Sequence, residues 1–311
     1  MLRIICFLLL NSRCAFYCYN KYLYTQIKYF QFAINSVRFS PDSRKIVSAS
    51  TDKTIRIWNV ASGRQLQIFK GHSDWINMAE FSSDGNTLIS CSCDNTIRLW
   101  DIQSGREKMK LVGHLDAVWC VKFSPDSKYI VSCSFDRTIR LWDVSFGKEI
   151  KKMIGHSSSV RTTQFSPDGQ MIASTSCDKT IALWDATSFE MLKQLAGHSN
   201  YVKYARFSPN GKCIVSCSSD KTIRIWSAKS GIILKVLEGH SDVVNEVDYF
   251  PDGQRIISCS DDNTMCLWDV EAGIEIQRLE GHTSYVNSVH ISPDGKLIVS
   301  CSHDKTIRIW C

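Results

Sequence analysis

The chain has 311 residues, of which 44% are hydrophobic and 22% charged, a composition typical of globular domains and not of disordered or fibrous proteins. The longest unbroken apolar run, Ile4 to Leu10, is too short to cross a bilayer as a helix, so we expect no membrane span. The formal net charge of +6 is concentrated at the start, because residues 1–30 contain four basic and no acidic residues. We therefore expect no direct nucleic-acid contact.

Residues 1–21 form an apolar N-terminal segment that precedes the repeated part of the chain. The apolar run within it lies at the short limit of a secretory-signal core, and no small-x-small cleavage site follows. We therefore disfavour a secretory signal and keep two alternatives, a truncated or misread start and an apolar tail that packs on the domain. The fourteen cysteines suit a reducing compartment, so we expect an intracellular protein of the cytoplasm or the nucleus.

The remainder of the chain consists of seven repeats with a period of 42 residues. A Gly-His pair recurs six times, from Gly71-His72 to Gly281-His282. A tryptophan recurs seven times, from Trp58 to Trp310, and an aspartate stands six residues before each one. No insertion or deletion interrupts the array, which is the pattern of a repeat architecture.

Each repeat is predicted to form four short strands. In the second repeat, Ile76 to Phe81 is an apolar stretch that ends in a turn, and Leu88 to Ser92 forms the next strand. Thr96 to Trp100 alternates between polar and apolar residues, and a turn at Ser104-Gly105 leads to a fourth, more polar strand. Period-2 patterning with frequent turns predicts an all-β protein.

The motifs Gly-His, Ser-x-Ser-x-Asp and Trp-Asp at this spacing resemble the WD40-repeat family, including its G-protein β-subunit-like and histone-methyltransferase-complex scaffold propellers. The resemblance covers residues 22–311. It implies one all-β domain, a seven-bladed β-propeller of four-stranded antiparallel blades around a central channel.

The resemblance also implies how the ring closes. The chain stops at Trp310-Cys311, in the third strand of the seventh repeat, so that blade lacks a fourth strand of its own. Leu23 to Ile27 is strand-like and lies one period before the fourth strand of the first repeat. We predict that this N-terminal strand completes the seventh blade, because an open ring would expose an unpaired strand edge.

In the family, the His, Ser, Asp and Trp of a repeat form a buried hydrogen-bonded set. These bonds satisfy polar groups whose burial would otherwise cost free energy. The resemblance therefore assigns a structural role to His72, Asp94, His114, Asp136, His156, Asp178, His198, Asp220, His240, Asp262, His282 and Asp304. Repetition of the set around the ring argues against a catalytic role for Ser, His and Asp. The first repeat has Tyr29-Phe30 in place of Gly-His, so we expect its blade to be the least well tied.

No cofactor or metal is expected. All sixteen glycines occupy repeated turns or Gly-His pairs, which leaves none for a phosphate-binding loop. The cysteines and histidines show no paired CxxC or HxxxH spacing of the kind that zinc sites require.

Partners of the family often dock at the channel mouth on the face that carries the Gly-His loops. The side chains there come three and five residues after the His and one residue before the Asp. Aromatic and charged residues at these positions are our predicted partner-binding rim: Trp75, Trp119, Phe135, Arg161, Tyr201, Lys203, Asp261, Tyr285 and His303. The alternative is that these side chains merely plug the channel mouth.

The favoured function is a non-enzymatic scaffold that assembles a multiprotein complex through this face. Its partners would be other proteins or peptides, and the propeller itself would be monomeric within the complex. One alternative is a reader of an arginine-containing, histone-tail-like peptide in a chromatin complex, because Trp119 matches an arginine-gripping position of a related propeller. The departure is blade six, where Val243 and Asn245 supply no second ring.

A propeller hydrolase is the least favoured alternative. Glycoside hydrolysis requires two convergent carboxylates. The acids outside the repeated sets, such as Glu80, Asp248 and Asp261, are spread over different blades, and no convergent pair can be named among them.

Overall fold

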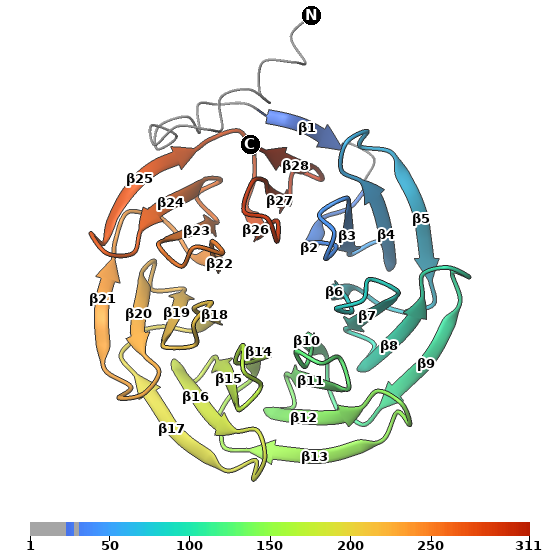
Figure 1. Ribbon diagram of the computed structural model, residues 1–311, viewed down its shortest axis with the longest axis horizontal. Coiled ribbons are helices and arrows are strands. Elements are labelled where there is room, and N and C mark those ends of the chain that lie inside the picture. The colour runs from blue at the N-terminus through green and yellow to red at the C-terminus, as the bar shows by residue number, and fades with distance from the viewer. Residues whose placement is uncertain (1–22, 28–30) are drawn as a thin grey trace, which may run out of the picture.

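Seven four-stranded antiparallel sheets form a ring around a central channel (Figure 1). The structure is a computed structural model that describes residues 23–27 and 31–311. The predicted apolar segment 1–21 lies outside these residues. The all-β, seven-bladed fold is confirmed, and the described residues contain no helix.

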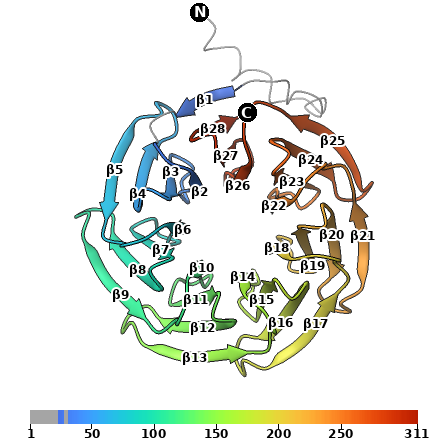
Figure 2. The same cartoon turned by 180° about the vertical axis from the view of Figure 1, so that it is seen from behind.

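In blades one to six the strands run outward from the channel in chain order, and in blade seven β1 lies outside β26, β27 and β28. The view from the opposite side shows the same arrangement (Figure 2). Blade one holds β2 (Ile34–Phe39), β3 (Lys45–Ser50), β4 (Thr54–Asn59) and β5 (Gln65–Lys70). Blades two and three hold β6 (Ile76–Phe81), β7 (Thr87–Ser92), β8 (Thr96–Asp101), β9 (Glu107–Val112), β10 (Val118–Phe123), β11 (Tyr129–Ser134), β12 (Thr138–Asp143) and β13 (Glu149–Ile154). Blades four and five hold β14 (Val160–Phe165), β15 (Met171–Ser176), β16 (Thr180–Asp185), β17 (Met191–Ala196), β18 (Val202–Phe207), β19 (Cys213–Ser218), β20 (Ile223–Ser227) and β21 (Ile233–Leu237). Blades six and seven hold β22 (Val244–Tyr249), β23 (Arg255–Ser260), β24 (Met265–Asp269), β25 (Ile274–Leu279), β26 (Val286–Ile291), β27 (Ile298–Ser302), β28 (Ile307–Trp310) and β1 (Leu23–Ile27).

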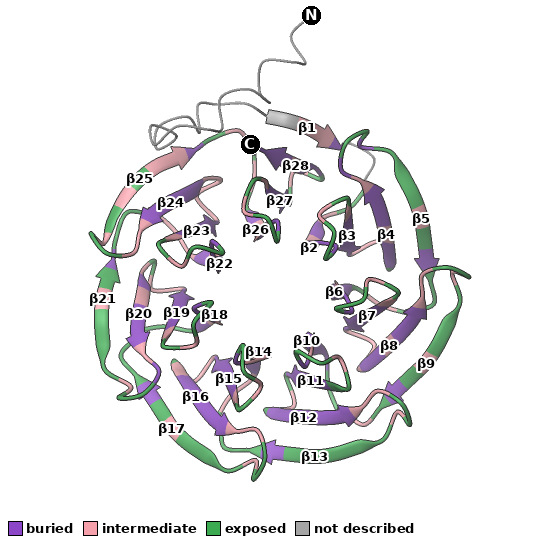
Figure 3. Cartoon of the chain, in the orientation of Figure 1, coloured by how far each residue is buried: buried purple, intermediate pink, exposed green. Residues whose placement is uncertain are grey.

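The core lies between neighbouring blades. The three inner strands of each blade are largely buried, whereas the outer strands are mostly exposed (Figure 3). Alternating side chains on β8 send Ile97 and Leu99 into the space facing blade three, where they join Val121 and Cys133 in one apolar cluster. Repeated small side chains such as Cys133 are fully buried, which fits their role as packing residues.

The N-terminal strand closes the ring, as predicted. β1 pairs antiparallel with β28, and Ile27 lies opposite Ile307. Ile27 is 1% exposed and packs with Trp58 of blade one and Ile309 of blade seven. A strand from the start of the chain therefore covers the edge that the last repeat would otherwise leave open (Figure 1).

Candidate functional site

Six blades contain the same buried chain of hydrogen bonds. In blade two, Trp100 Nε1 donates to Ser90 Oγ at 2.9 Å, and Ser90 Oγ lies 2.8 Å from His72 Nε2. His72 Nδ1 lies 2.9 Å from Asp94 Oδ2, and because a carboxylate only accepts, Nδ1 carries the proton. The equivalent His–Asp pairs are His114–Asp136, His156–Asp178, His198–Asp220, His240–Asp262 and His282–Asp304, at 2.7–2.9 Å.

This order of contacts matches that of a catalytic triad, but the site is closed. Ser90 is 0% exposed, and its hydroxyl oxygen already accepts the indole N–H of Trp100. A substrate carbonyl has no route to such a hydroxyl, so the geometry supports a structural role.

The carboxylates of these sets are held in the charged form. Burial raises the pKa of Asp178, but the hydrogen bonds from His156 and Thr180 outweigh burial and lower the pKa to about 2. In blade one, where the His is replaced, Asp52 instead accepts from Arg56 Nη2 at 2.8 Å. An arginine on β4 thus supplies part of the interaction that histidine supplies elsewhere.

The innermost strand of every blade has a break in its pairing register close to the channel mouth. In all seven blades the pairing register shifts across the second residue of this strand, as between Val118 and Cys120 in blade three. A bulge leaves one residue outside the ladder and redirects its side chain. The second residues are Asn35, Asn77, Trp119, Arg161, Lys203, Asn245 and Asn287.

In four blades this second residue is an asparagine that ties its blade to the next. Asn77 Nδ2 donates to the carbonyl oxygen of Val118 at 2.8 Å, and Asn287 Nδ2 closes the ring by donating to Ile34 at 2.8 Å. Asn35 and Asn245 make the same bond to the following blade. Blades three, four and five replace this structural asparagine with Trp119, Arg161 and Lys203, which marks their part of the mouth as chemically different.

A cavity of about 700 Å³ opens at this mouth, on the face of the Gly-His loops. Five of the nine predicted rim residues line it, namely Trp75, Trp119, Arg161, Lys203 and His303. We call this opening the wide mouth.

The other four predicted residues do not line the cavity. Phe135 packs against Trp119 with ring centroids 5.2 Å apart, and Tyr285 packs against His303 at 5.7 Å. Asp261 accepts from Asn245 Nδ2 at 2.6 Å, which gives it a contact within its own blade. Tyr201 is 49% exposed and directly precedes β18, whose second residue, Lys203, lines the cavity.

Two exposed apolar residues on this face were not predicted. Phe32 is 53% exposed and lines the cavity, and Leu115 is 78% exposed directly after His114. Both occupy repeat positions where most other blades carry Asp, Asn, Ser or Thr, so comparison of those positions would have found them.

Trp119 is already covered by an arginine of the same chain. The guanidinium carbon of Arg161 lies 3.8 Å from the centroid of the Trp119 ring, a cation–π contact. The indole Nε1 is buried and has no acceptor among the described residues. An arginine supplied by a peptide could take this ring face only if Arg161 moved away.

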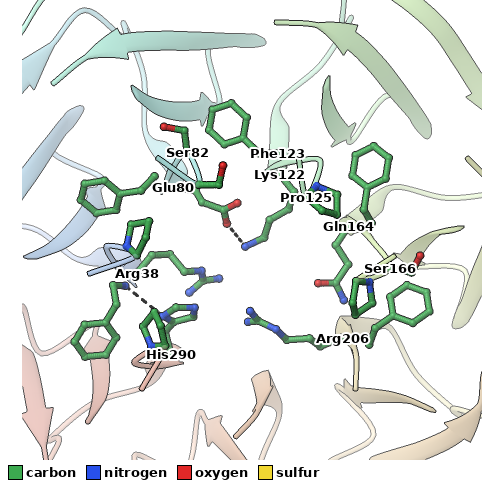
Figure 4. Close-up of a pocket in the computed structure, with 18 residues that line it drawn as sticks. Arg38, Glu80, Ser82, Lys122, Phe123, Pro125, Gln164, Ser166, Arg206 and His290 are labelled. Carbon is green, nitrogen blue, oxygen red and sulfur yellow. Dashed lines mark hydrogen bonds and ion pairs between the residues drawn. The ribbon is translucent and has the colours of Figure 1, made fainter. Parts of the chain in front are cut away.

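The opposite mouth of the channel has a different character. A cavity of about 390 Å³ there is lined by the proline-containing turns and by the fifth residue of most innermost strands. Figure 4 shows Arg38, Lys122, Arg206 and His290 pointing into this space. We call this opening the narrow mouth.

Each of the three strong cations at the narrow mouth has an acidic partner. Arg38 Nη2 lies 2.5 Å from Glu246 Oε1, and Lys122 contacts Glu80. Arg206 Nε lies 3.0 Å from Asp248 Oδ1. The narrow mouth is therefore a self-neutralised network that links blades across the channel.

No metal centre emerges from the described part of the chain: residues 23–27 and 31–311 contain no group of three or more His, Cys, Asp or Glu placed to hold an ion. Ten of the eleven cysteines of these residues, all but Cys311, are free thiols. None of these residues belongs to a helix long and apolar enough to cross a membrane.

Short segments of the chain are similar to several curated proteins. One segment is 49% identical over 39 residues to the Notchless protein homolog of Arabidopsis thaliana, which covers 12% of this chain and 8% of that protein. Another is 49% identical over 43 residues to the Nuclear distribution protein PAC1 of Candida tropicalis, covering 14% and 9% respectively. A third is 44% identical over 41 residues to the Probable serine/threonine-protein kinase PkwA of Thermomonospora curvata, covering 13% and 6%. The matched segment thus spans less than a tenth of the length of each relative.

A model of the family described as WD domain, G-beta repeat matches residues 21–59, 63–101, 105–143, 147–185, 189–227, 231–269 and 273–311. Each match contains the outer strand of one blade and the three inner strands of the next, so that 63–101 covers β5 of blade one and β6–β8 of blade two, and 21–59 covers β1 of blade seven and β2–β4 of blade one. From residue 21 to residue 311, only three residues separate each match from the next. This chain therefore belongs to the WD40-repeat family of β-propellers.

Proposed function

We propose that this chain is a non-catalytic scaffold that binds segments of other proteins at the wide mouth of its channel. The family to which it belongs consists mainly of interaction scaffolds. The observation that carries the proposal is the collection of exposed aromatic rings at one mouth: Trp75 and Phe32 line the cavity and are 54% and 53% exposed, and Tyr285, outside its lining, is 49% exposed. Large rings left in water beside a concave opening are typical of binding hot spots.

The polar groups in the channel support binding rather than catalysis. Glu246 and Asp248 lie on one strand, but Glu246 is held by Arg38 and Asp248 by Arg206. Both carboxylates are nearly buried, with 3% of each residue exposed. A hydrolase would need one carboxylate free to donate a proton and a second one open to the substrate.

The proposal is tested by capturing partners with the wild-type protein and with a Trp75→Ala/Tyr201→Ala double variant. Both side chains are about half exposed, so their removal leaves the blade cores intact. We expect the double variant to lose the partners that the wild type retains.

A matched control is an Ile150→Ala/Leu192→Ala double variant, which removes comparable exposed apolar surface from the outer strands β13 and β17. It should retain the wild-type partners. If the mouth variant keeps every partner while the outer-strand variant loses them, partners bind the circumference of the ring and the proposal fails.

A further inference from the structure

Two neighbouring cations at the wide mouth have no acidic partner. Arg161 and Lys203 each form no ion pair or hydrogen bond within the described residues, 23–27 and 31–311; the guanidinium of Arg161 lies over the ring of Trp119. Asp261 attracts Lys203 from beyond ion-pair distance and is itself engaged by Asn245. Burial lowers the pKa of both cations, and in Lys203 the charge of Arg161 adds to the effect.

The contrast with the narrow mouth shows that this arrangement is not a general feature of the channel. There, Arg38, Lys122 and Arg206 each contact a carboxylate. Two partly desolvated like charges without a counter-ion are unfavourable unless something else supplies the negative charge.

The cavity that the pair lines adds a cation, Lys305, and its one lining acid among the described residues, Glu246, is held by Arg38. Lys179 and Lys221 stand on turns of blades four and five, and Lys221 Nζ donates to the carbonyl oxygen of Ser241 at 2.7 Å. The acids beside them, Asp178 and Asp220, are bound by His156 and His198. This face of blades four and five is therefore rich in donors and poor in acceptors.

The stacked geometry leaves Arg161 able to bind. Contact with the Trp119 ring covers one face of the guanidinium and holds the group in place. The N–H groups lie in the plane of the guanidinium, at its edges, so they stay available for a bidentate anion.

We infer that the partner segment that enters the wide mouth carries an anionic side chain, a phosphorylated residue or a carboxylate, which binds between Arg161 and Lys203. The inference rests on the proposed scaffold function and adds the chemical class of its ligand. The aromatic rings of Trp75 and Phe32, on the other side of the cavity, would contact the apolar flank of the same segment.

The test uses four peptide libraries with random flanking sequence and a fixed central phosphoserine, glutamate, serine or arginine. The 311-residue chain is immobilised, and the retained fraction of each library is measured for wild type, Arg161→Met and Lys203→Met. Lys151→Met is the matched control, since Lys151 is an exposed cation on the outer strand β13. Variants are compared only after their melting curves show that they are folded.

We expect the phosphoserine or glutamate library to bind at least about tenfold better than the serine library, as a charge-assisted hydrogen bond would provide. Arg161→Met and Lys203→Met should each remove most of that preference, and Lys151→Met should keep it. Preference for phosphoserine over glutamate would assign a phosphorylated partner, and equal binding an acidic one.

Other results overturn the inference. These are equal retention of the serine and anionic libraries, strongest retention of the arginine library, or retention of none. If neutral peptides bind and Trp75→Ala abolishes their binding, the inference of an anionic ligand is wrong, but the proposal that partners bind at the wide mouth is supported. If binding of every library is indifferent to Trp75→Ala, Arg161→Met and Lys203→Met, the proposed function fails as well.

Discussion

The Arg161 guanidinium carbon lies 3.8 Å from the centroid of the Trp119 ring. The two residues occupy the same repeat position in neighbouring blades, where four other blades carry a structural asparagine. In the other four blades the asparagine forms a hydrogen bond to the next blade. At Trp119 and Arg161 a stacked pair at the edge of the cavity stands in place of that hydrogen bond. In three consecutive blades, Trp119, Arg161 and Lys203 take the place of this asparagine and line the wide mouth.

Lys203→Met should make the fold more stable. The ammonium group is partly desolvated beside Arg161 and has no ion pair in the described structure, so an apolar side chain of similar length removes an unfavourable charge. We expect a gain of about 0.5–1 kcal/mol in the free energy of unfolding, measured by urea denaturation. Lys122→Met is the matched comparison and should cost about 2 kcal/mol, because it leaves Glu80 without its cation. A loss of stability in both variants would contradict the functional reading of Lys203.

Asp94→Ala should destabilise the protein more than Asp52→Ala. Asp94 accepts from the buried His72, from the Ser73 amide and from Thr96, and its loss leaves the imidazole unpaired. Asp52 contacts no histidine in the described residues, and its partner Arg56 retains access to water. We expect losses of about 3 and about 1 kcal/mol respectively in urea unfolding. Equal losses would show that the histidine adds nothing to the set.

Stability should fall with acidification in two stages. Burial lowers the pKa of His114, His198 and His282 below the usual 6.5, against the pull of their aspartates, so the unfolded chain binds these protons first. The contribution of these histidines to the free energy of unfolding is therefore fully present above about pH 6.5 and declines as the pH falls below that value.

The second stage comes from the aspartates of the same sets. Hydrogen bonds lower the pKa of Asp178 to about 2 from the usual 3.8, despite burial, so its contribution is present above pH 3.8 and is lost on approach to pH 2. Urea midpoints measured from pH 8 to pH 2 should show both stages, and Asp178→Asn should flatten the lower one. A midpoint that rises on acidification would contradict this assignment.

Ile27 should matter far more than its place near the chain start suggests. It is 1% exposed between blades seven and one, so Ile27→Ala should cost about 2–4 kcal/mol. Leu66→Ala, on the outer strand β5 and 52% exposed, should change stability by less than about 0.5 kcal/mol. Deletion of residues 1–30 should give an unstable or aggregating protein, and an unchanged melting temperature would show that β1 does not close the ring.

The fold could be predicted because the local signals repeat, the tryptophan and its preceding aspartate seven times and the Gly-His pair six times. The 42-residue period sets the number of blades, and one period subtracted from the fourth strand of blade one locates Leu23–Ile27 opposite β28. A closed ring also leaves few alternatives for the pairing of its ends.

The chemistry of the two mouths could not be predicted in the same way. The pairing of Arg38 with Glu246 joins residues 208 positions apart, and it depends on the radius of the channel and on the reach of both side chains. The same is true of Arg161 and Trp119, because repeat arithmetic places them in adjacent blades but does not show which way each side chain turns at its bulge. Side-chain direction at an irregular strand position requires the three-dimensional structure.

The most direct test of the central claim, that partners bind at the wide mouth, is site-specific photocrosslinking in cells. A photoreactive residue at position 201 stands beside the mouth, and one at position 192 stands on the outer strand β17 with similar exposure. We predict crosslinked partners from position 201 that are absent from position 192 and that disappear when Trp75→Ala is added. Crosslinks from position 192 alone, with none from position 201, would contradict the account.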